Sequence, residues 1–126
     1  MNNQEYIERA QRYVQLSNQG DLTQIQRMFA SHAVYYSAYF GEYVGNQSIH
    51  DMMCEFFGRF QDAHWQVEEY RCIEERGVEF DFVMTGTNIS TGESVERYGL
   101  EKIFFTAAGL IEKIVVCKAK KPHFKQ

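Results

Sequence analysis

Cysteine and proline are both scarce in this sequence, which has three cysteines and a single proline in 126 residues. The low proline content excludes a proline-rich linker and differs from the composition of disordered chains. Cys54, Cys72 and Cys117 are widely spaced, odd in number and without a CxxC pair, so they do not form the disulfide framework of a small secreted domain. We therefore expect reduced, structural thiols.

Long apolar runs and excess positive charge are also missing. No stretch approaches the roughly 18 apolar residues of a membrane-spanning helix, and residues 1–10 lack the apolar segment of a signal peptide. We therefore expect a cytoplasmic protein with no membrane partner. The formal net charge of −4 argues against nucleic-acid binding, which needs a basic surface. Residues 118–125 are rich in lysine, and we interpret them as a solvated tail.

The common short motifs of nucleotide, metal and nucleophile chemistry do not occur. The sequence has no phosphate-binding P-loop, no GxGxxG, no HExxH and no GxSxG. Its four histidines, His32, His50, His64 and His123, are too scattered along the chain to indicate a metal site. We therefore expect neither a metal nor a cofactor.

The residues that are present indicate one soluble globular domain. Apolar residues make up 44% of the chain, aromatic residues 15% and charged residues 24%, which is typical of proteins with a packed core. A chain of 126 residues holds a single core and has room for one pocket. No linker or internal repeat divides it, so we predict one domain over residues 1–126.

Three segments have the 3.6-residue apolar period of amphipathic helices. They cover residues 3–19, 22–30 and 47–60. Gly20 is placed to end the first helix, and Asp21 and Asn46 are placed to cap the second and the third. The third segment is rich in phenylalanine and methionine, so we expect this helix to be largely buried.

A two-residue period of apolar and polar side chains dominates the rest of the chain. Five strands are predicted, over residues 32–40, 64–75, 77–90, 93–106 and 110–120. The order helix, helix, strand, helix and four-strand meander predicts an α+β fold. We expect a curved antiparallel or mixed sheet that wraps around the three N-terminal helices and forms a cone-like α+β barrel with an open mouth.

Several motifs in these elements resemble those of the nuclear-transport-factor-2-like superfamily. They are QRYV (11–14), NQGDL (18–22), Ile25, MFASHAV (28–34), GNQSI (45–49) and EKIFFTAAGLI (101–111). Within this superfamily the chain most resembles the ketosteroid isomerases and the SnoaL-like polyketide cyclases. The resemblance covers almost the whole chain. It implies no single activity, because this fold hosts isomerases, cyclases, dehydratases, hydrolases and non-catalytic proteins.

The resemblance to ketosteroid isomerases implies two catalytic residues. The catalytic tyrosine of that family falls on Tyr13, and its catalytic carboxylic acid falls on Glu101. In the family the acid is kept neutral, so that both groups donate hydrogen bonds to an oxyanion. The family's general base is an aspartate on the first strand, and Ser37 stands there in this chain. A serine hydroxyl cannot accept a proton at neutral pH without an activating base of its own.

Strand alternation and the resemblance together predict the lining of a ligand pocket. The predicted ligand-binding residues are Tyr35, Ser37, Met53, Phe82, Met84, Asn88, Arg97, Ile114, Val116 and Lys118. A few polar groups on apolar walls are typical of sites for small organic ligands. The two cations, Arg97 and Lys118, favour an anionic or strongly polar ligand.

The sequence leaves the protonation state of Glu101 open. Arg97 precedes Glu101 on the same face of the strand. A nearby cation favours the ionised carboxylate, whereas burial favours the neutral acid. An ionised Glu101 could act as a base, with Tyr13 and Arg97 as the donors. A structural ion pair between Arg97 and Glu101, without catalysis, is the remaining possibility.

Two functions follow from these observations. The first is a cofactor-free acid–base isomerase, cyclase or dehydratase that acts on a small polar or anionic carbonyl compound. The alternative is a non-catalytic ligand-binding or protein-association module that has lost the catalytic base, in which Tyr13 belongs to the packed core. The resemblance also implies a homodimer that buries Tyr98, Leu100 and Phe104 on the outer face of the sheet.

Overall fold

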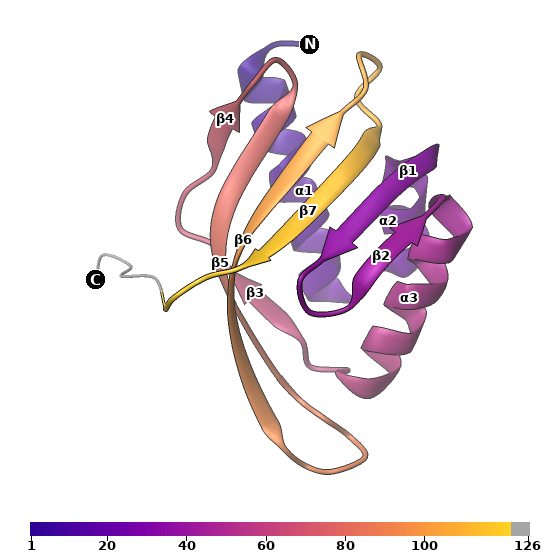
Figure 1. Ribbon diagram of the computed structural model, residues 1–126, viewed down its shortest axis with the longest axis vertical. Coiled ribbons are helices and arrows are strands. Elements are labelled where there is room, and N and C mark those ends of the chain that lie inside the picture. Colours follow the sequence, from indigo (N-terminus) through magenta and orange to yellow (C-terminus); the bar gives the residue numbers. More distant parts are fainter. Residues whose placement is uncertain (122–126) are drawn as a thin grey trace.

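The computed structural model describes residues 1–121, which form three helices and a seven-stranded sheet (Figure 1). The helices are α1 (Asn3–Gln19), α2 (Leu22–Met28) and α3 (Asn46–Arg59). The strands are β1 (Phe29–Ser37), β2 (Gly41–Val44), β3 (His64–Gln66), β4 (Arg71–Ile73), β5 (Gly77–Thr87), β6 (Ser94–Phe105) and β7 (Ile111–Lys118). His123 and the end of the lysine-rich tail lie outside the described residues. Within residues 1–121, no helix is long and apolar enough to cross a membrane.

The first helix begins and ends where the sequence predicts. The side chain of Asn2 accepts the backbone N–H of Glu5, and the carboxylate of Glu5 accepts the N–H of Asn2, which together form a capping box. At the other end, Gly20 takes the left-handed conformation, with φ of 66°, and its N–H closes the last turn. Asp21 then caps α2 by accepting the N–H of Gln24, as predicted.

The sheet is mixed and open. Its strand order is β2-β1-β7-β6-β5-β3, and β4 lies beside β5 off this path. β1 runs parallel to β7, while the other pairs are antiparallel. Figure 1 shows the helices on one side of the curved sheet and the long β5–β6 hairpin extending beyond it. The predicted α+β class with a curved, cone-like mixed sheet is confirmed.

The predicted single strand over residues 64–75 is wrong. The structure has two short strands there, β3 and β4, and both pair with β5. The cause is a contact from α1: the side-chain amide of Asn18 donates to the carbonyl of Trp65 and accepts its N–H, at 3.0 and 2.8 Å. This pair of hydrogen bonds holds β3 against α1, and residues 67–70 then leave the sheet before β4 begins.

Two further boundaries differ around β1. The strand covers residues 29–37 rather than 32–40, so α2 ends at Met28, and the segment Gly41–Val44 forms β2 instead of a turn. The reversal between the two strands is made at Ser37, whose hydroxyl accepts the N–H groups of Tyr39 and Phe40 at 3.0 and 3.2 Å. Local side-chain hydrogen bonds of this kind stop a strand in favour of a turn.

Asn46 is not the cap of α3, so that prediction is wrong. Gly45 occupies the capping position and makes no side-chain hydrogen bond. Asn46 is the first residue of the helix, and its amide donates to the carbonyls of Gln26 and Phe29, both at 3.0 Å. Asn46 therefore fastens the start of α3 to the junction between α2 and β1.

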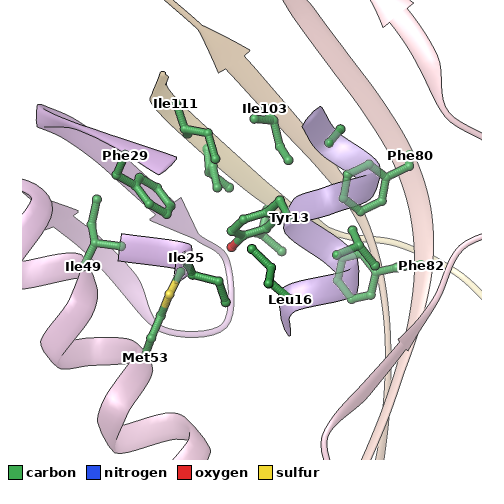
Figure 2. Close-up of a cluster of buried hydrophobic side chains, with 14 of the residues drawn as sticks. Tyr13, Leu16, Ile25, Phe29, Ile49, Met53, Phe80, Phe82, Ile103 and Ile111 are labelled. Atoms are coloured by element: carbon green, nitrogen blue, oxygen red, sulfur yellow. The ribbon is translucent and has the colours of Figure 1, made fainter. Parts of the chain in front are cut away.

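The core lies between the helices and the inner face of the sheet (Figure 2). Figure 2 shows the ring of Tyr13 in the middle of a buried cluster, with Ile25 and Met53 on one side and Phe80 on the other. The ring of Tyr13 also meets the ring of Phe29 edge-on, with centroids 6.0 Å apart. The core therefore holds Tyr13 rigidly and fixes the direction of its phenol group.

Candidate functional site

Two neighbouring hollows, called here the inner and the outer lobe, share several lining residues between the helices and the sheet. The inner lobe has a cavity volume of about 50 Å³. It is lined by Tyr13, Val14, Ser17, Tyr35, Phe40, Met52, Met53, Phe56, Phe57, Trp65, Phe80 and Glu101. The outer lobe is lined by Tyr35, Ser37, Tyr39, Phe40, Phe56, Trp65, Phe82, Met84, Arg97, Glu101 and Val116. Glu101 lines both lobes, so a ligand in either one meets its carboxyl group.

Strand register explains how these side chains meet. Ser37 on β1 lies opposite Val116 on β7, Val116 lies opposite Glu101 on β6, and Glu101 lies opposite Phe80 on β5. Because neighbouring strands are about 4.8 Å apart, this row places the Ser37 and Glu101 backbones roughly 10 Å apart across the inner face. Tyr35 points from the next row on the same side, and α1 brings Tyr13 from above.

Glu101 is a buried carboxyl group without a partner. Its side chain is 5% exposed, its direct cross-strand neighbours are Phe80 and Val116, and its Oε2 atom makes no hydrogen bond to the described residues. Burial among these apolar side chains raises the pKa of Glu101 to about 8. At neutral pH most molecules therefore carry a neutral carboxylic acid at this position, which can donate a hydrogen bond or a proton.

Arg97 does not convert Glu101 into a carboxylate. The two residues are four positions apart along β6, which is about 13 Å between backbone positions at roughly 3.3 Å per residue. The guanidinium of Arg97 is held instead among three aromatic rings, with its Cζ atom 5.4, 5.3 and 5.4 Å from the ring centroids of Tyr39, Phe40 and Phe60. The pKa of Glu101 is accordingly set by burial, and the structure has no ion pair between Arg97 and Glu101.

Tyr13 remains a hydrogen-bond donor over the whole physiological range. Its side chain is 6% exposed, and burial raises its pKa well above the usual value, with further contributions from Tyr35 and from the charge of Glu101. Tyr13 and Glu101 are both buried and both line the inner lobe. The packing and pocket interpretations of Tyr13 are therefore both correct, because its ring belongs to the core while it lines the inner lobe.

The pKa values of two more tyrosines are raised, in part by the same carboxyl group. Burial, followed by the charge of Glu101, raises the pKa of Tyr35 well above its usual value and the pKa of Tyr70 to about 12. Tyr70 lies in the segment between β3 and β4, and its ring packs on Phe80 with centroids 5.0 Å apart. Of these tyrosines, Tyr13 and Tyr35 line the inner lobe together with Glu101 and are the potential donors to an oxygen placed there.

Ser37 is buried and lines the outer lobe, but its oxygen is already engaged. It accepts two backbone N–H groups at the turn after β1. With both acceptor sites used, the hydroxyl has only its hydrogen left to offer. Ser37 is therefore a donor in this hollow and cannot take a proton from a ligand.

Comparison with known proteins agrees with this architecture. The family model for the SnoaL-like domain matches residues 10–113. The chain belongs to the SnoaL-like family. No curated protein matched this chain in a sequence search. Three solved structures share its fold.

The first of these structures is the epoxide hydrolase/cyclase-like enzyme SalBIII, with 16% identity, coverage of 94% of this chain and 93% of the other, and a TM-score of 0.85. The second is an NTF2-like protein of unknown function from Exiguobacterium, with 13% identity, coverage of 90% and 99%, and a TM-score of 0.78. The third is a candidate polyketide cyclase from Xanthomonas campestris, with 14% identity, coverage of 92% and 91%, and a TM-score of 0.75. At these identities the likeness shows the fold alone.

The structure brings most of the predicted site residues of this SnoaL-like domain together. The two lobes contain Tyr13, Tyr35, Ser37, Met53, Phe82, Met84, Arg97, Glu101 and Val116. Three predicted residues are absent from the lining. Asn88 follows the end of β5, where its side chain accepts the N–H groups of Ser90 and Thr91. Ile114 is fully buried in the core. Lys118 is exposed, and its ammonium lies 5.2 Å from the ring centroid of Tyr39.

Several aromatic lining residues escaped the sequence analysis. Phe40, Phe56, Phe57 and Trp65 all line the inner lobe, and Met52 lies beside them. The phenylalanine content of α3 predicts a buried helix, and Phe56 is buried. Phe56 and Phe57 also form part of one wall of the hollow. No local signal identifies Trp65 as a lining residue, because its position depends on the contact with Asn18.

Proposed function

We propose that this SnoaL-like protein is a cofactor-free acid–base enzyme that acts on an oxygen-bearing organic molecule held in the hollow. The observation that carries the proposal is Glu101, a buried carboxyl group whose pKa is raised to about 8 and whose Oε2 atom has no partner among the described residues. A carboxylic acid kept neutral at pH 7 is suited to giving a proton to a substrate oxygen. Tyr13 supplies a second donor from the opposite wall.

The groups that can give or accept a proton in the hollow favour ring closure, dehydration or isomerisation. Glu101 gives its proton to an epoxide, hydroxyl or carbonyl oxygen as negative charge develops there, and Tyr13 donates a hydrogen bond to the same atom. The carboxylate that results is the base that accepts the proton released later in the same turnover. One carboxyl group thus serves as acid and then as base, and Ser37 is not required to accept a proton. A single positioned acid of this kind contributes about 10²–10⁴-fold to a rate.

A hydroxy-epoxide is the most direct test substrate, because its closure to a cyclic ether needs only these two proton transfers. The purified protein is incubated with 4,5-epoxypentan-1-ol, and cyclic ether is quantified by gas chromatography against a buffer control. We expect product above the buffer rate, and a loss of at least about 100-fold in that excess rate for Glu101→Gln. Tyr13→Phe should lose less, because it removes one of two donors.

The alternative function is a non-catalytic ligand-binding module, and Ser37 favours it. A hydroxyl engaged in a turn stands where related isomerases carry a base, so a chain that only binds would have the same feature. Wild-type protein that forms no product above buffer from the hydroxy-epoxide or from a β-hydroxy ketone would contradict the enzyme proposal. A Glu101→Gln variant that keeps the full rate would contradict it equally.

We also propose a homodimer that forms through the outer face of the sheet. Tyr98, Leu100 and Phe104 are only partly covered in one copy, and the ammonium of Lys113 lies 5.5 Å from the ring centroid of Phe104. Apolar side chains gathered on an uncovered sheet face favour association. Light scattering after size exclusion should give twice the mass of one chain, and Leu100→Lys should shift the mass to that of the monomer. A monomeric wild type would contradict the proposal.

A further inference from the structure

Two buried polar atoms without hydrogen-bond partners lie in the same lobe. Among the described residues they are Nη1 of Arg97 and Oε2 of Glu101, and both residues line the outer lobe. Unpaired buried polar atoms destabilise a fold and are rare in native proteins, so each needs a physical reason. Because both residues line one lobe, a single molecule bound there is a candidate partner for both atoms.

The setting of Arg97 restricts what it can bind. The rings of Tyr39, Phe40 and Phe60 surround its guanidinium, and the hydroxyl of Tyr39 is itself fixed by donating to the carbonyl of Tyr98 at 2.8 Å. Rings packed around a guanidinium leave hydrogen bonding to the N–H groups at its planar edge. That edge matches the two oxygens of a carboxylate, which arginine binds through parallel hydrogen bonds.

The floor between Arg97 and Glu101 is apolar. Gly99 lies midway on β6, and the ring of Phe82 packs directly over it: a Cβ atom added at Gly99 would lie 2.4 Å from Cζ of Phe82. Met84 and Val116 extend this surface on the neighbouring strands. A molecule that reaches both ends must therefore place hydrocarbon or an aromatic group over Phe82.

We propose that the ligand is an elongated organic acid, whose carboxylate binds the edge of Arg97, whose apolar middle lies on Phe82, and whose second oxygen faces Glu101. The part of this proposal that concerns the oxygen facing Glu101 rests on the proposed function. The part that concerns the carboxylate rests only on Arg97. The backbone separation of about 13 Å between the two residues, shortened by their side chains, fits a chain of several bonds between the two oxygen groups.

A matched pair of probes tests this proposal directly. The probes are 5-oxo-5-phenylpentanoate, which has a ketone oxygen, an apolar middle and a carboxylate, and its methyl ester, which lacks only the negative charge. Binding is measured by isothermal titration at pH 6.5. We expect the acid to bind wild-type protein at least about tenfold more tightly than the ester, because a charged hydrogen-bonded pair is lost in the ester.

Variants assign the selectivity to its source. Arg97→Met keeps an apolar side chain among the three rings and should remove the preference for the acid over the ester. Arg59→Met removes an equal charge from an exposed position at the end of α3 and should leave the preference intact. Melting temperatures and circular dichroism establish that each variant is folded. Arg97→Lys, which keeps the charge but lacks the planar edge, should retain only part of the preference.

The outcomes separate this inference from the proposed function. Equal affinity of wild-type protein for acid and ester, an unchanged preference in Arg97→Met, or no binding of either probe at millimolar concentration would overturn it. Glu101→Leu, which removes the hydrogen-bond donor, should weaken acid and ester alike, since both carry the ketone. If Glu101→Leu is folded and has no effect on binding while Arg97→Met abolishes the preference, the carboxylate site stands and the proposed role of Glu101 is contradicted.

Discussion

Two glutamates on opposite faces of the sheet, Glu79 and Glu101, have opposite environments. They lie on neighbouring strands one register position apart, because Glu101 faces Phe80 across the β5–β6 pair. On the outer face, Glu79 accepts from Nε of Arg71 at 3.1 Å and forms an ion pair with Nη2 at 3.0 Å. On the inner face, Glu101 has no cation beside it, and Oε2 has no hydrogen bond to the described residues.

The difference shows that position in the fold, rather than residue type, decides what a carboxyl group can do. Arg71 also pairs with Asp81, at 3.2 Å, so the outer face has a small network of charges in contact with water. Such pairs contribute little to stability. On the inner face, Glu101 lies among largely apolar and aromatic side chains with no ion-pair partner, and burial raises its pKa to about 8.

The largest expected effect is on the pH dependence of stability. Glu101 has a folded-state pKa of about 8 against an ordinary value of 4.5, so between these values the folded state holds a proton that the unfolded state releases. Its contribution to stability is complete below about pH 4.5 and is lost as the pH rises to about 8. Relative to Glu101→Gln, the wild type should lose as much as roughly 5 kcal/mol across this range. Urea denaturation of both proteins from pH 4.5 to 8.5 measures the difference, and parallel stability curves would refute the account.

A smaller effect on stability is expected from overpacking the apolar floor between Arg97 and Glu101. Gly99→Ala puts a Cβ atom 2.4 Å from the ring of Phe82 and 2.9 Å from the backbone oxygen of Cys117. Overpacking of this kind should cost about 1–3 kcal/mol. Gly58→Ala is the matched control, because nothing lies within 4 Å of its added Cβ on α3, and it should be neutral or slightly stabilising. Thermal denaturation measures both, and equal effects would show that Phe82 is not packed on Gly99 as described.

The smallest effect is expected on the outer face. Glu79→Gln removes one partner of Arg71, which keeps its pairing with Asp81. The change in the free energy of unfolding should be about 0–1 kcal/mol, as for other partly exposed ion pairs. The same urea experiment provides the readout. A loss of unfolding free energy as large as that of a core substitution would contradict this expectation. It would show that the outer ion pairs are important for stability.

Much of this fold could be predicted from the sequence, because its signals are local. Gly20 and Asp21 mark the boundary between the first two helices, and strand alternation together with the family resemblance predicts Phe82 and Val116 in the lining of the hollow. The resemblance to ketosteroid isomerases placed Tyr13 and Glu101, and both line the inner lobe.

The remaining features depend on contacts between distant parts of the chain. The division of β3 from β4 follows from Asn18, and the place of Trp65 in the hollow follows from the same contact. Asn88 looked like the next inward residue of a strand, but hydrogen bonds to the following turn remove it. The sequence could not decide whether Arg97 or burial sets the protonation state of Glu101. That outcome depends on the aromatic rings that hold Arg97, and these rings come from two other segments of the chain.

The most direct measurement is the titration of the Glu101 carboxyl carbon by NMR, with Glu101→Gln used to assign the signal. The account predicts a midpoint near pH 8 in the folded protein. A midpoint near 4.5 would mean that the carboxyl group is ionised at neutral pH, and an acid that has already lost its proton could not donate it to a ligand.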